Sequence, residues 1–244
     1  MKSLPLFGML FCCLATAQQP TLTSPKAMVV IELFTSQGCS TCPAADELLK
    51  EFTLKSQSEN KSVFGLSFHV NYWNHLGWVD PYSSEQFTKR QKKYFEVLHL
   101  PSYYTPQMVV NGWEDLVGSN SKRLNEAVDF ALTNAPQYEI AARATVQDKK
   151  VLIEYEVSKM PKNEIVNVAL VELSVANDVP RGENKGKFLK HYNVVRKLDS
   201  QNLKKKDVVA LEIPQGLEAA NRSVIIFIQD RGTYHIIGAT KIDF

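Results

Sequence analysis

Apolar residues near the start of the chain form two strand-like runs with a helix-like segment between them. Residues 28–34 and 63–70 are short and mostly apolar, as expected of strands that are covered on both faces of a sheet. Pro43 fixes a helical backbone angle where a helix would begin, and apolar residues such as Leu49 and Phe52 follow at helical spacing. The pattern therefore predicts a strand–helix–strand unit.

A second group of signals surrounds a less regular segment at residues 71–100. Its first part is an aromatic loop, and residues 84–98 have an amphipathic helical pattern with a serine in the N-cap position. Asn111 and Gly112 stand between two strand-like runs, which indicates a β-hairpin. Residues 121–135 predict a further helix.

The pattern changes after Pro136. Short strand-like runs follow, separated mostly by turn residues, and they lie at 138–146, 151–157, 165–175, 187–198, 208–213, 223–229 and 234–242. About seven strands without helices are typical of a β-sandwich. The sequence therefore predicts an α/β N-terminal domain at residues 26–136, with residues 71–100 as an insertion, and an all-β sandwich-like C-terminal domain at residues 137–244.

The charge of the chain is nearly balanced. Its 244 residues include 28 basic and 26 acidic ones, for a formal net charge of +2. A basic stretch at residues 204–206 is better explained as a solvated turn than as a binding patch. We therefore expect no nucleic-acid partner.

Residues 1–17 have the pattern of a secretory signal peptide, with a basic start, an apolar stretch at residues 4–14 and a small-residue cleavage site ending at Ala17. The apolar stretch is too short for a stable membrane span. We expect an exported protein, periplasmic or secreted. Cleavage would remove Cys12 and Cys13; a lipid anchor at one of them is the alternative, which the bulky residues before Cys12 disfavour.

Cys39 and Cys42 form a C-x-x-C motif at the turn between the first predicted strand and its helix. The N-terminus of a helix stabilises the thiolate of the first cysteine, and the thiolate is the form that attacks disulfides. Without the predicted signal peptide, these two cysteines remain, too few for a four-cysteine zinc site. We therefore interpret Cys39 as the nucleophile of a redox pair, and Cys42 as the cysteine that resolves the mixed disulfide.

Several segments resemble a known family. Residues 32–43, which read ELFTSQGCSTCP, carry the strongest match, and residues 76–78, 104–112 and 181–184 support it. In these segments the chain resembles exported bacterial thioredoxin-like proteins catalogued as domain of unknown function 1223. The resemblance implies a thioredoxin-like fold for the N-terminal domain. For the polar loop at residues 181–186, docking onto that domain, contact with a partner and a plain surface loop remain open.

Pro106 resembles the proline of thioredoxin-like proteins that follows a cis peptide bond and faces the active disulfide. In that position the backbone of Thr105 would be free to pair with a bound peptide strand. The resemblance thus implies a catalytic role for Pro106, and substrate binding by Thr105 and the neighbouring Tyr104. An ordinary trans proline at the start of a strand is the alternative.

Glu32, Trp73 and Trp78 are further candidate residues. Glu32 is a carboxylate in an otherwise apolar strand, and a buried carboxylate beneath the disulfide would shuttle the proton that Cys42 must lose. A salt-bridged or solvent-facing residue is the equal alternative. Trp73 and Trp78 belong to the aromatic loop, which would either shape a peptide groove near the dithiol or pack the insertion onto the sheet.

These residues predict an exported thiol–disulfide oxidoreductase whose cofactor is its own Cys39–Cys42 disulfide. With no second cysteine pair, the protein needs an external redox partner besides the protein thiols or disulfides on which it acts. A periplasmic copper carrier that adds His69, His75 or His99 to the cysteines is an alternative. No two of these histidines have a recognised ligand spacing, so we assign no metal ligands. A partner-binding protein with a redox-sensing dithiol is another alternative.

Overall fold

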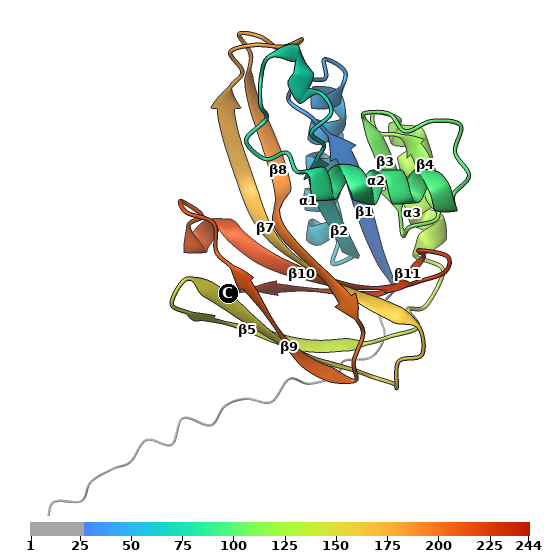
Figure 1. Ribbon diagram of the computed structural model, residues 1–244. Coiled ribbons are helices and arrows are strands. Elements are labelled where there is room, and N and C mark those ends of the chain that lie inside the picture. Colours follow the sequence, from blue (N-terminus) through green and yellow to red (C-terminus); the bar gives the residue numbers. More distant parts are fainter. Residues whose placement is uncertain (1–26) are drawn as a thin grey trace, which may run out of the picture.

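One large mixed sheet runs through the molecule (Figure 1). The computed structural model describes residues 27–244, so the predicted signal peptide lies outside the described residues. The sheet has eight strands in the order β11-β10-β7-β8-β2-β1-β3-β4. In chain order these strands are β1 (Met28–Thr35), β2 (Ser62–His69), β3 (Gln107–Val110), β4 (Glu114–Val117), β7 (Glu164–Asp178), β8 (Phe188–Asn202), β10 (Arg222–Asp230) and β11 (Ile236–Asp243).

The first part of this sheet follows the predicted strand–helix–strand pattern. β1 and β2 pair in parallel, and α1 (Cys42–Ser58) connects them. β3 is antiparallel to β1 and forms the predicted hairpin with β4. At the hairpin turn, Asn111 and Gly112 have φ angles of 45° and 74°, positive values of the kind that tight hairpin turns require.

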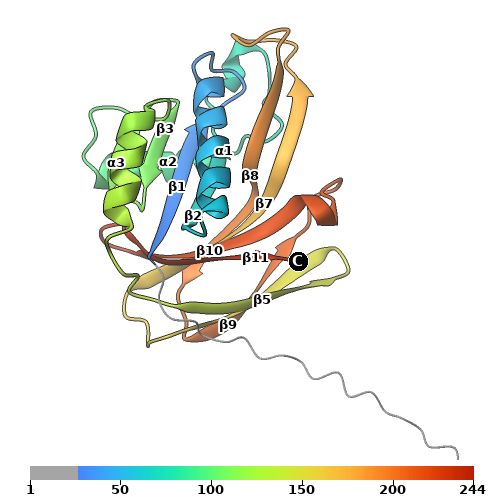
Figure 2. The ribbon, with the colours of Figure 1, turned by 180° about the vertical axis from the view of Figure 1, so that it is seen from behind.

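Helices cover both faces of this part of the sheet. α1 and α3 (Ser121–Ala131) lie on one face, as Figure 2 shows, and α2 (Glu85–Val97) lies on the other. Successive side chains of β1 point to opposite faces, so alternate apolar residues pack on α1 and α3 or on α2. α2 is the helix predicted at residues 84–98, and the Ser84 hydroxyl caps it by accepting a hydrogen bond from the helix backbone.

A second, three-stranded sheet packs on the far part of the large one (Figure 1). Its strands, in the order β5-β6-β9, are β5 (Ile140–Gln147), β6 (Lys150–Val157) and β9 (Lys206–Glu212). Alternate apolar residues of β7 and β10 pack against β6 and β9 and bury a second core. Sheet-on-sheet packing is thus present, but one of the two sheets continues into the first half of the chain.

The predicted division into a thioredoxin-like α/β domain and a separate all-β sandwich-like domain is wrong, because strands from both halves share one sheet. β8 pairs in parallel with β2, with Ser67 opposite Val194, and in antiparallel with β7. β7 and β8 have 15 residues each, so one part of this ribbon lies beside β2 while another covers the three-stranded sheet. The large sheet therefore contains strands from both sides of the predicted domain boundary at residues 136–137.

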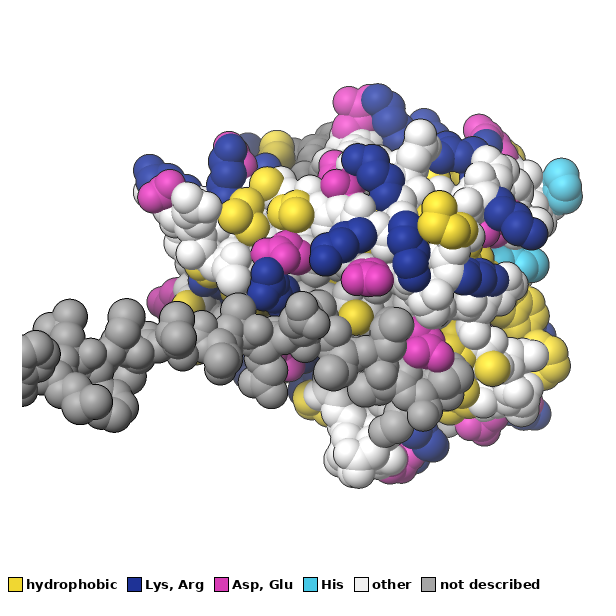
Figure 3. Space-filling view, turned by 90° about the horizontal axis from the view of Figure 1, so that it is seen from below, with side chains coloured by type: hydrophobic (Ala, Val, Ile, Leu, Met, Phe, Trp, Pro, Cys, Tyr) yellow, Lys and Arg dark blue, Asp and Glu magenta, His cyan; other side chains and the backbone are white. Residues whose placement is uncertain are grey.

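Charged side chains of both signs are interspersed on the face that Figure 3 shows, in keeping with the balance of charges in the sequence. Among the helices of residues 27–244, none has the length and apolar character needed to cross a bilayer.

Candidate functional site

The two cysteines lie where β1 ends and α1 begins. The backbone N–H of Cys39 donates to the carbonyl of Ser36 at 3.2 Å, which closes a turn before the helix. Cys42 is the first residue of α1, and its N–H donates to the carbonyl of Cys39 at 3.3 Å. Both cysteines are free thiols, with Cys39 1% exposed and Cys42 fully buried. The turn therefore holds a buried dithiol at the N-terminus of a helix, where thiolates are stabilised.

The surroundings of the two thiols separate their acidities. The pKa of Cys39 is lowered to about 6, mainly by a hydrogen bond from Cys42 and further by the hydroxyls of Thr105 and Thr41, against the opposing effect of burial. Burial raises the pKa of Cys42, and the charges of the Cys39 thiolate and of Asp46 raise it further. Cys39 therefore ionises first and is the better nucleophile of the two.

The Thr105–Pro106 peptide bond is cis, as predicted. The Thr105 hydroxyl stabilises the Cys39 thiolate and accepts a hydrogen bond from Trp73 Nε1 at 2.8 Å. The structure thus brings Thr105 beside Cys39, with Trp73 bonded to Thr105 and Pro106 following it in the chain. Tyr104 points elsewhere, because its hydroxyl donates to a carboxylate oxygen of Asp115 at 3.1 Å.

Trp78 contacts the cysteine turn through the side chain of Gln37. Its indole N–H donates to Gln37 Oε1 at 2.9 Å. Glu32 lies on the face of β1 opposite α1, where its carboxylate binds Arg90 at 2.5 and 2.8 Å and the Tyr94 hydroxyl at 2.5 Å. This is the salt-bridged arrangement that the sequence left open, and it does not bring Glu32 to the cysteines.

The loop between β7 and β8 fastens the cysteine turn from the other half of the chain. Asn184 is fully buried, and its Nδ2 donates to the carbonyls of Gln37 and Cys39 at 2.9 and 2.8 Å. The N–H of Ser40 donates to a carboxylate oxygen of Glu183 at 2.9 Å. Of the options left open for residues 181–186, docking is therefore the one observed.

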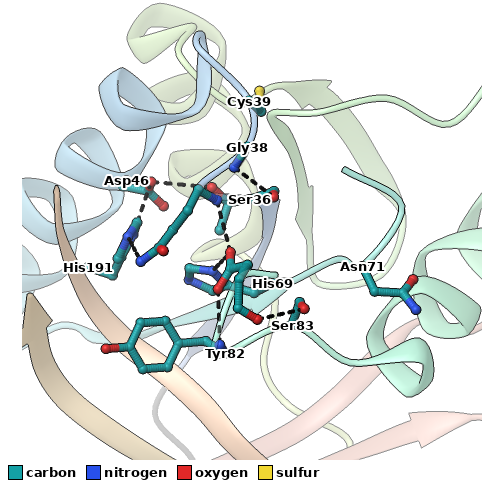
Figure 4. Close-up of polar contacts among 12 residues, drawn as sticks. Ser36, Gly38, Cys39, Asp46, His69, Asn71, Tyr82, Ser83 and His191 are labelled. Atoms are coloured by element: carbon teal, nitrogen blue, oxygen red, sulfur yellow. Dashed lines mark hydrogen bonds and ion pairs between the residues drawn. The ribbon is translucent and has the colours of Figure 1, made fainter. Parts of the chain in front are cut away.

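A cluster of buried polar side chains lies behind the turn (Figure 4). Its members come from both halves of the chain and are at most 2% exposed: Thr35, Gln37, Asp46, His69, Asp80 and His191. Figure 4 labels Asp46, His69 and His191. Asp46 Oδ2 accepts a hydrogen bond from Thr35 Oγ1 at 3.3 Å and lies 3.3 Å from His191 Nδ1. The rings of His69 and His191 are in contact, with centroids 4.7 Å apart. These contacts form a polar layer between the dithiol and β8.

Sequence reasoning missed this cluster. Asp46 follows Cys42 by four residues, and that spacing on a predicted helix is a signal that the sequence contains. His191 has no such signal, because its place depends on the pairing of β8 with β2.

His69 and Asp80 form a buried pair within the cluster. His69 Nδ1 and Asp80 Oδ2 are 2.7 Å apart, and the same oxygen accepts the N–H of Gln37 at 2.9 Å. Burial alone would lower the pKa of His69, but the charge and hydrogen bond of Asp80 outweigh it and raise that pKa. Burial alone would raise the pKa of Asp80, but the charge of His69 and the backbone donors lower it. Asp80, from the aromatic loop, therefore contacts both Gln37 of the cysteine turn and His69 of β2.

Within residues 27–244, no three His, Cys, Asp or Glu side chains are grouped so that they could hold a metal ion. Two of the histidines named above for a copper carrier have other partners. His69 contacts Asp80, and His75 lies at the surface, 2.6 Å from the carbonyl of Tyr72.

The site draws on residues from both halves of the chain, and so does the match to known sequences. The model of a family described as a protein of unknown function (DUF1223) matches residues 30–229. The chain belongs to this family. The match extends from β1 into β10, so it includes the cysteine turn, the loop at residues 181–184 and His191. The resemblance to the family catalogued as domain of unknown function 1223 is confirmed.

A solved structure similar to this DUF1223 protein is that of protein AGR_C_4864 from Agrobacterium tumefaciens. The two are 25% identical with a TM-score of 0.66, over 90% of this chain and 96% of that chain. A domain of the outer membrane lipoprotein Omp28 from Porphyromonas gingivalis is 14% identical with a TM-score of 0.29, over 45% of this chain and 88% of that one. The β-glucuronidase of Ruminococcus gnavus is 12% identical with a TM-score of 0.25, over 44% and 15%. The last two likenesses are too weak to carry an argument.

None of the curated proteins compared with this DUF1223 chain matches it.

Proposed function

We propose that this DUF1223 protein is an exported thiol–disulfide oxidoreductase whose reacting groups are Cys39 and Cys42. The observation that carries the proposal is the opposite shift of two neighbouring pKa values. The pKa of Cys39 is lowered to about 6, while the pKa of Cys42 is raised. A thiolate at neutral pH beside a protonated thiol is the starting state for disulfide exchange.

In the reducing direction, Cys39 Sγ attacks one sulfur of a substrate disulfide. The substrate S–S bond breaks, and its second sulfur leaves as a thiolate that takes up a proton. Cys42 then loses its proton and attacks Cys39 Sγ, which releases the first substrate sulfur. Two electrons pass to the substrate, which becomes a dithiol, and the protein keeps a Cys39–Cys42 disulfide. The reverse sequence oxidises a substrate dithiol.

An external redox partner has to restore the starting state. Residues 27–244 contain no cysteine besides Cys39 and Cys42, so electrons cannot pass to a second pair within them. Protein thiols or disulfides are the substrate class that this chemistry fits.

Trp73 and Thr105 support the thiolate of Cys39 in this reaction. The indole N–H of Trp73 is only a donor, so it occupies a lone pair of the Thr105 hydroxyl. The hydroxyl proton is thereby left for the sulfur of Cys39, whose pKa it lowers. We therefore assign Trp73 the positioning of Thr105.

The low exposure of Cys39 sets a condition on access. At 1% exposed, its side chain meets a substrate sulfur only after part of the surrounding wall has moved. Trp73 and Gly182, from the loop between β7 and β8, both lie close to Gly38 in this wall. Movement of one of them is thus a step of the reaction.

The reduction potential of the cysteine pair tests the proposal. Residues 18–244, purified free of metal, are equilibrated in dithiothreitol or glutathione buffers, and the free thiols are trapped. We expect the pair to close and reopen reversibly, and Cys39→Ser to abolish this. A potential near about −270 mV marks a reductant, and one near about −120 mV an oxidant. A pair that never closes, or never reopens, overturns the proposal, and stoichiometric Cu(I) binding would then favour the copper carrier.

A further inference from the structure

Resolution of the mixed disulfide requires that Cys42 lose a proton inside the protein. We propose that Asp46 takes this proton and that His191 positions the Asp46 carboxylate to do so. The inference rests on the proposed thiol–disulfide exchange and assigns further residues to it.

Asp46 is placed to receive the proton. It follows Cys42 by four residues of α1, so the two side chains lie on the same face of the helix, and Asp46 is 2% exposed. Its Oδ2 accepts the hydroxyl of Thr35, whereas its Oδ1 has no hydrogen-bond partner among the described residues. An unpartnered buried carboxylate oxygen is costly for stability. Here it leaves a free acceptor beside a thiol that has to lose its proton.

Thr35 connects the thiol to the carboxylate. Its hydroxyl donates to Asp46 Oδ2 at 3.3 Å, and the same proton, once the hydroxyl turns to Cys42, favours the Cys42 thiolate. A hydroxyl has one proton to give and two lone pairs to accept with. The Cys42 proton can therefore pass to Thr35 Oγ1 while the Thr35 proton passes to Asp46, and the carboxyl group ends one proton richer.

The tautomer of His191 follows from its neighbours. The indole N–H of Trp78 is only a donor, so the Gln37 atom that it meets at 2.9 Å is the amide oxygen. The amide NH2 of Gln37 therefore faces Asn177 Oδ1 at 2.7 Å and His191 Nε2 at 3.1 Å. His191 Nε2 accepts, and the proton of the neutral ring is on Nδ1, 3.3 Å from Asp46 Oδ2.

This tautomer separates the roles of the two residues. Nδ1 of the neutral His191 ring already carries a proton and Nε2 is occupied by Gln37, so the ring cannot take the proton from Cys42. Its Nδ1 lies 3.3 Å from Asp46 Oδ2 without the geometry of a hydrogen bond, so the ring orients the carboxylate through the dipole of its N–H group. Asp46 is the proton acceptor, and His191 is a positioning residue that reaches the site from β8.

Other charged groups surround Asp46, and the pH dependence of the reaction includes them. The titratable and charged groups connected to Asp46, directly or through a neighbouring side chain, are Cys39, Cys42, His69, Asp80, Tyr82, His191 and Arg196. The charge of Asp46 helps to keep His69 protonated. The rates below are therefore compared between variants at each pH over a range.

The experiment separates the two thiols in time. Reduced residues 18–244 are mixed rapidly with 5,5′-dithiobis(2-nitrobenzoate), a small chromogenic disulfide. Attack by Cys39 releases one nitrothiobenzoate anion in a first phase, and attack by Cys42 on the mixed disulfide releases the other in a second phase. The first phase reports the proposed function, and the second reports this inference. Cys42→Ser is expected to show the first phase alone.

Asp46→Asn is the deciding variant, because the two possible roles of Asp46 predict opposite signs. Its charge raises the pKa of Cys42, so a purely electrostatic neighbour, once removed, would speed the second phase. Loss of the proton acceptor instead slows the second phase at pH 7 by about 100-fold and makes its rate proportional to hydroxide concentration. Glu51→Gln, which removes an exposed carboxylate from the same helix, is the matched control and leaves both phases unchanged.

His191→Asn and His191→Leu test the positioning. Asn places an amide donor where Nδ1 lies and keeps most of the second-phase rate, whereas Leu lacks the donor and slows that phase about tenfold or more. A second phase that is unchanged or faster in Asp46→Asn overturns the proposal, and so do equal rates in the two His191 variants. If Asp46→Asn does not fold, it loses the first phase too, and the His191 pair decides. A missing first phase in the unaltered protein overturns the proposed function instead.

Discussion

Cys39 and Cys42 are three residues apart, yet their sulfurs meet opposite surroundings. Hydrogen bonds from Cys42, Thr105 and Thr41 converge on Cys39, and the bond from Cys42 contributes most to its low pKa. Cys42 instead faces a buried interior that contains the carboxylate of Asp46. The acidity of Cys39 therefore depends more on its partner cysteine than on any other side chain.

Replacing Cys42 should consequently change the pKa of Cys39. We expect Cys42→Ala to raise it from about 6, because the largest hydrogen bond to the thiolate is lost, and Cys42→Ser, which keeps a donor, to raise it less. The rate of alkylation by iodoacetamide as a function of pH measures this in residues 18–244, with Cys39→Ser as the blank. A midpoint near the ordinary value of 9.0 in the unaltered reduced protein would contradict the low pKa.

The buried His69–Asp80 pair makes stability depend on pH. The pKa of His69 is raised in the folded protein, so its contribution is complete below the ordinary value of 6.5 and is lost as the pH rises through the raised pKa. The pKa of Asp80 is lowered, so its contribution is present above the ordinary value of 3.8 and is lost as the pH falls through the lowered pKa. From this pair alone, the free energy of unfolding should decrease from neutral toward alkaline pH.

His69→Gln tests that slope. Urea unfolding at several pH values is compared with and without this substitution, both in a Cys39→Ser background that removes the low pKa of Cys39 from the comparison. We expect a flatter dependence above pH 6.5 in His69→Gln, because the group whose proton is lost on the alkaline side is gone. Equal slopes in the two proteins would show that His69 does not carry the effect.

At the scale of elements, the loop between β7 and β8 (residues 179–187), which we call the clasp, holds the turn between β1 and α1 in place. Asn184 donates from a fully buried position to two backbone carbonyls of the turn, that of Gln37 and that of Cys39, which also accepts the N–H of Cys42. A second contact joins the Ser40 N–H to Glu183. The conformation of the cysteine turn is thus held by a segment that lies far away in the sequence.

Asn184→Ala should destabilise the protein. It removes the side-chain donor to the buried carbonyl of Gln37 and leaves the carbonyl of Cys39 with the Cys42 N–H alone, which costs about 1–3 kcal/mol of unfolding free energy. Urea unfolding of the reduced protein measures the loss. Lys185→Ala, an exposed substitution on the same loop, is the control and should change the free energy by less than about 0.5 kcal/mol. A loss for Asn184→Ala as small as that of the control would mean that the clasp adds nothing.

The helices and strands also show which features of the fold could be predicted from the sequence. Features set by neighbours along the chain were predictable, such as the Ser84 cap of α2 and the turn at Asn111 and Gly112. The cis bond before Pro106 followed from the family resemblance. The position of His191 was out of reach, because an alternating apolar pattern identifies a strand but does not name the strand that it pairs with.

The whole molecule is held together across its two halves. β8 lies beside β2, and one core includes Phe34 and Phe68 from the first half with Val171, Val195 and Phe227 from the second. The site follows the same division, with the cysteines in one half and Asn184 and His191 in the other.

A fragment of residues 27–136 should therefore not fold alone. Without β7, β8 and β10, the edge of β2 has no partner and a large part of its core is uncovered. We expect no cooperative urea transition in the circular dichroism of this fragment, whereas residues 27–244 unfold cooperatively. A cooperative transition of the fragment would instead show that the shared sheet is not needed for the first half.

The shared sheet also means that the cysteines are synthesised before the segments that bury them. A chain leaves the ribosome from its N-terminus, so both cysteines emerge long before the clasp and β8 that bury them. Through that interval the nascent chain carries two reachable thiols and an unpaired strand edge, a combination open to oxidation and to aggregation. Biogenesis of this protein therefore includes a stage at which its cysteines are more accessible to other proteins than they are after folding is complete.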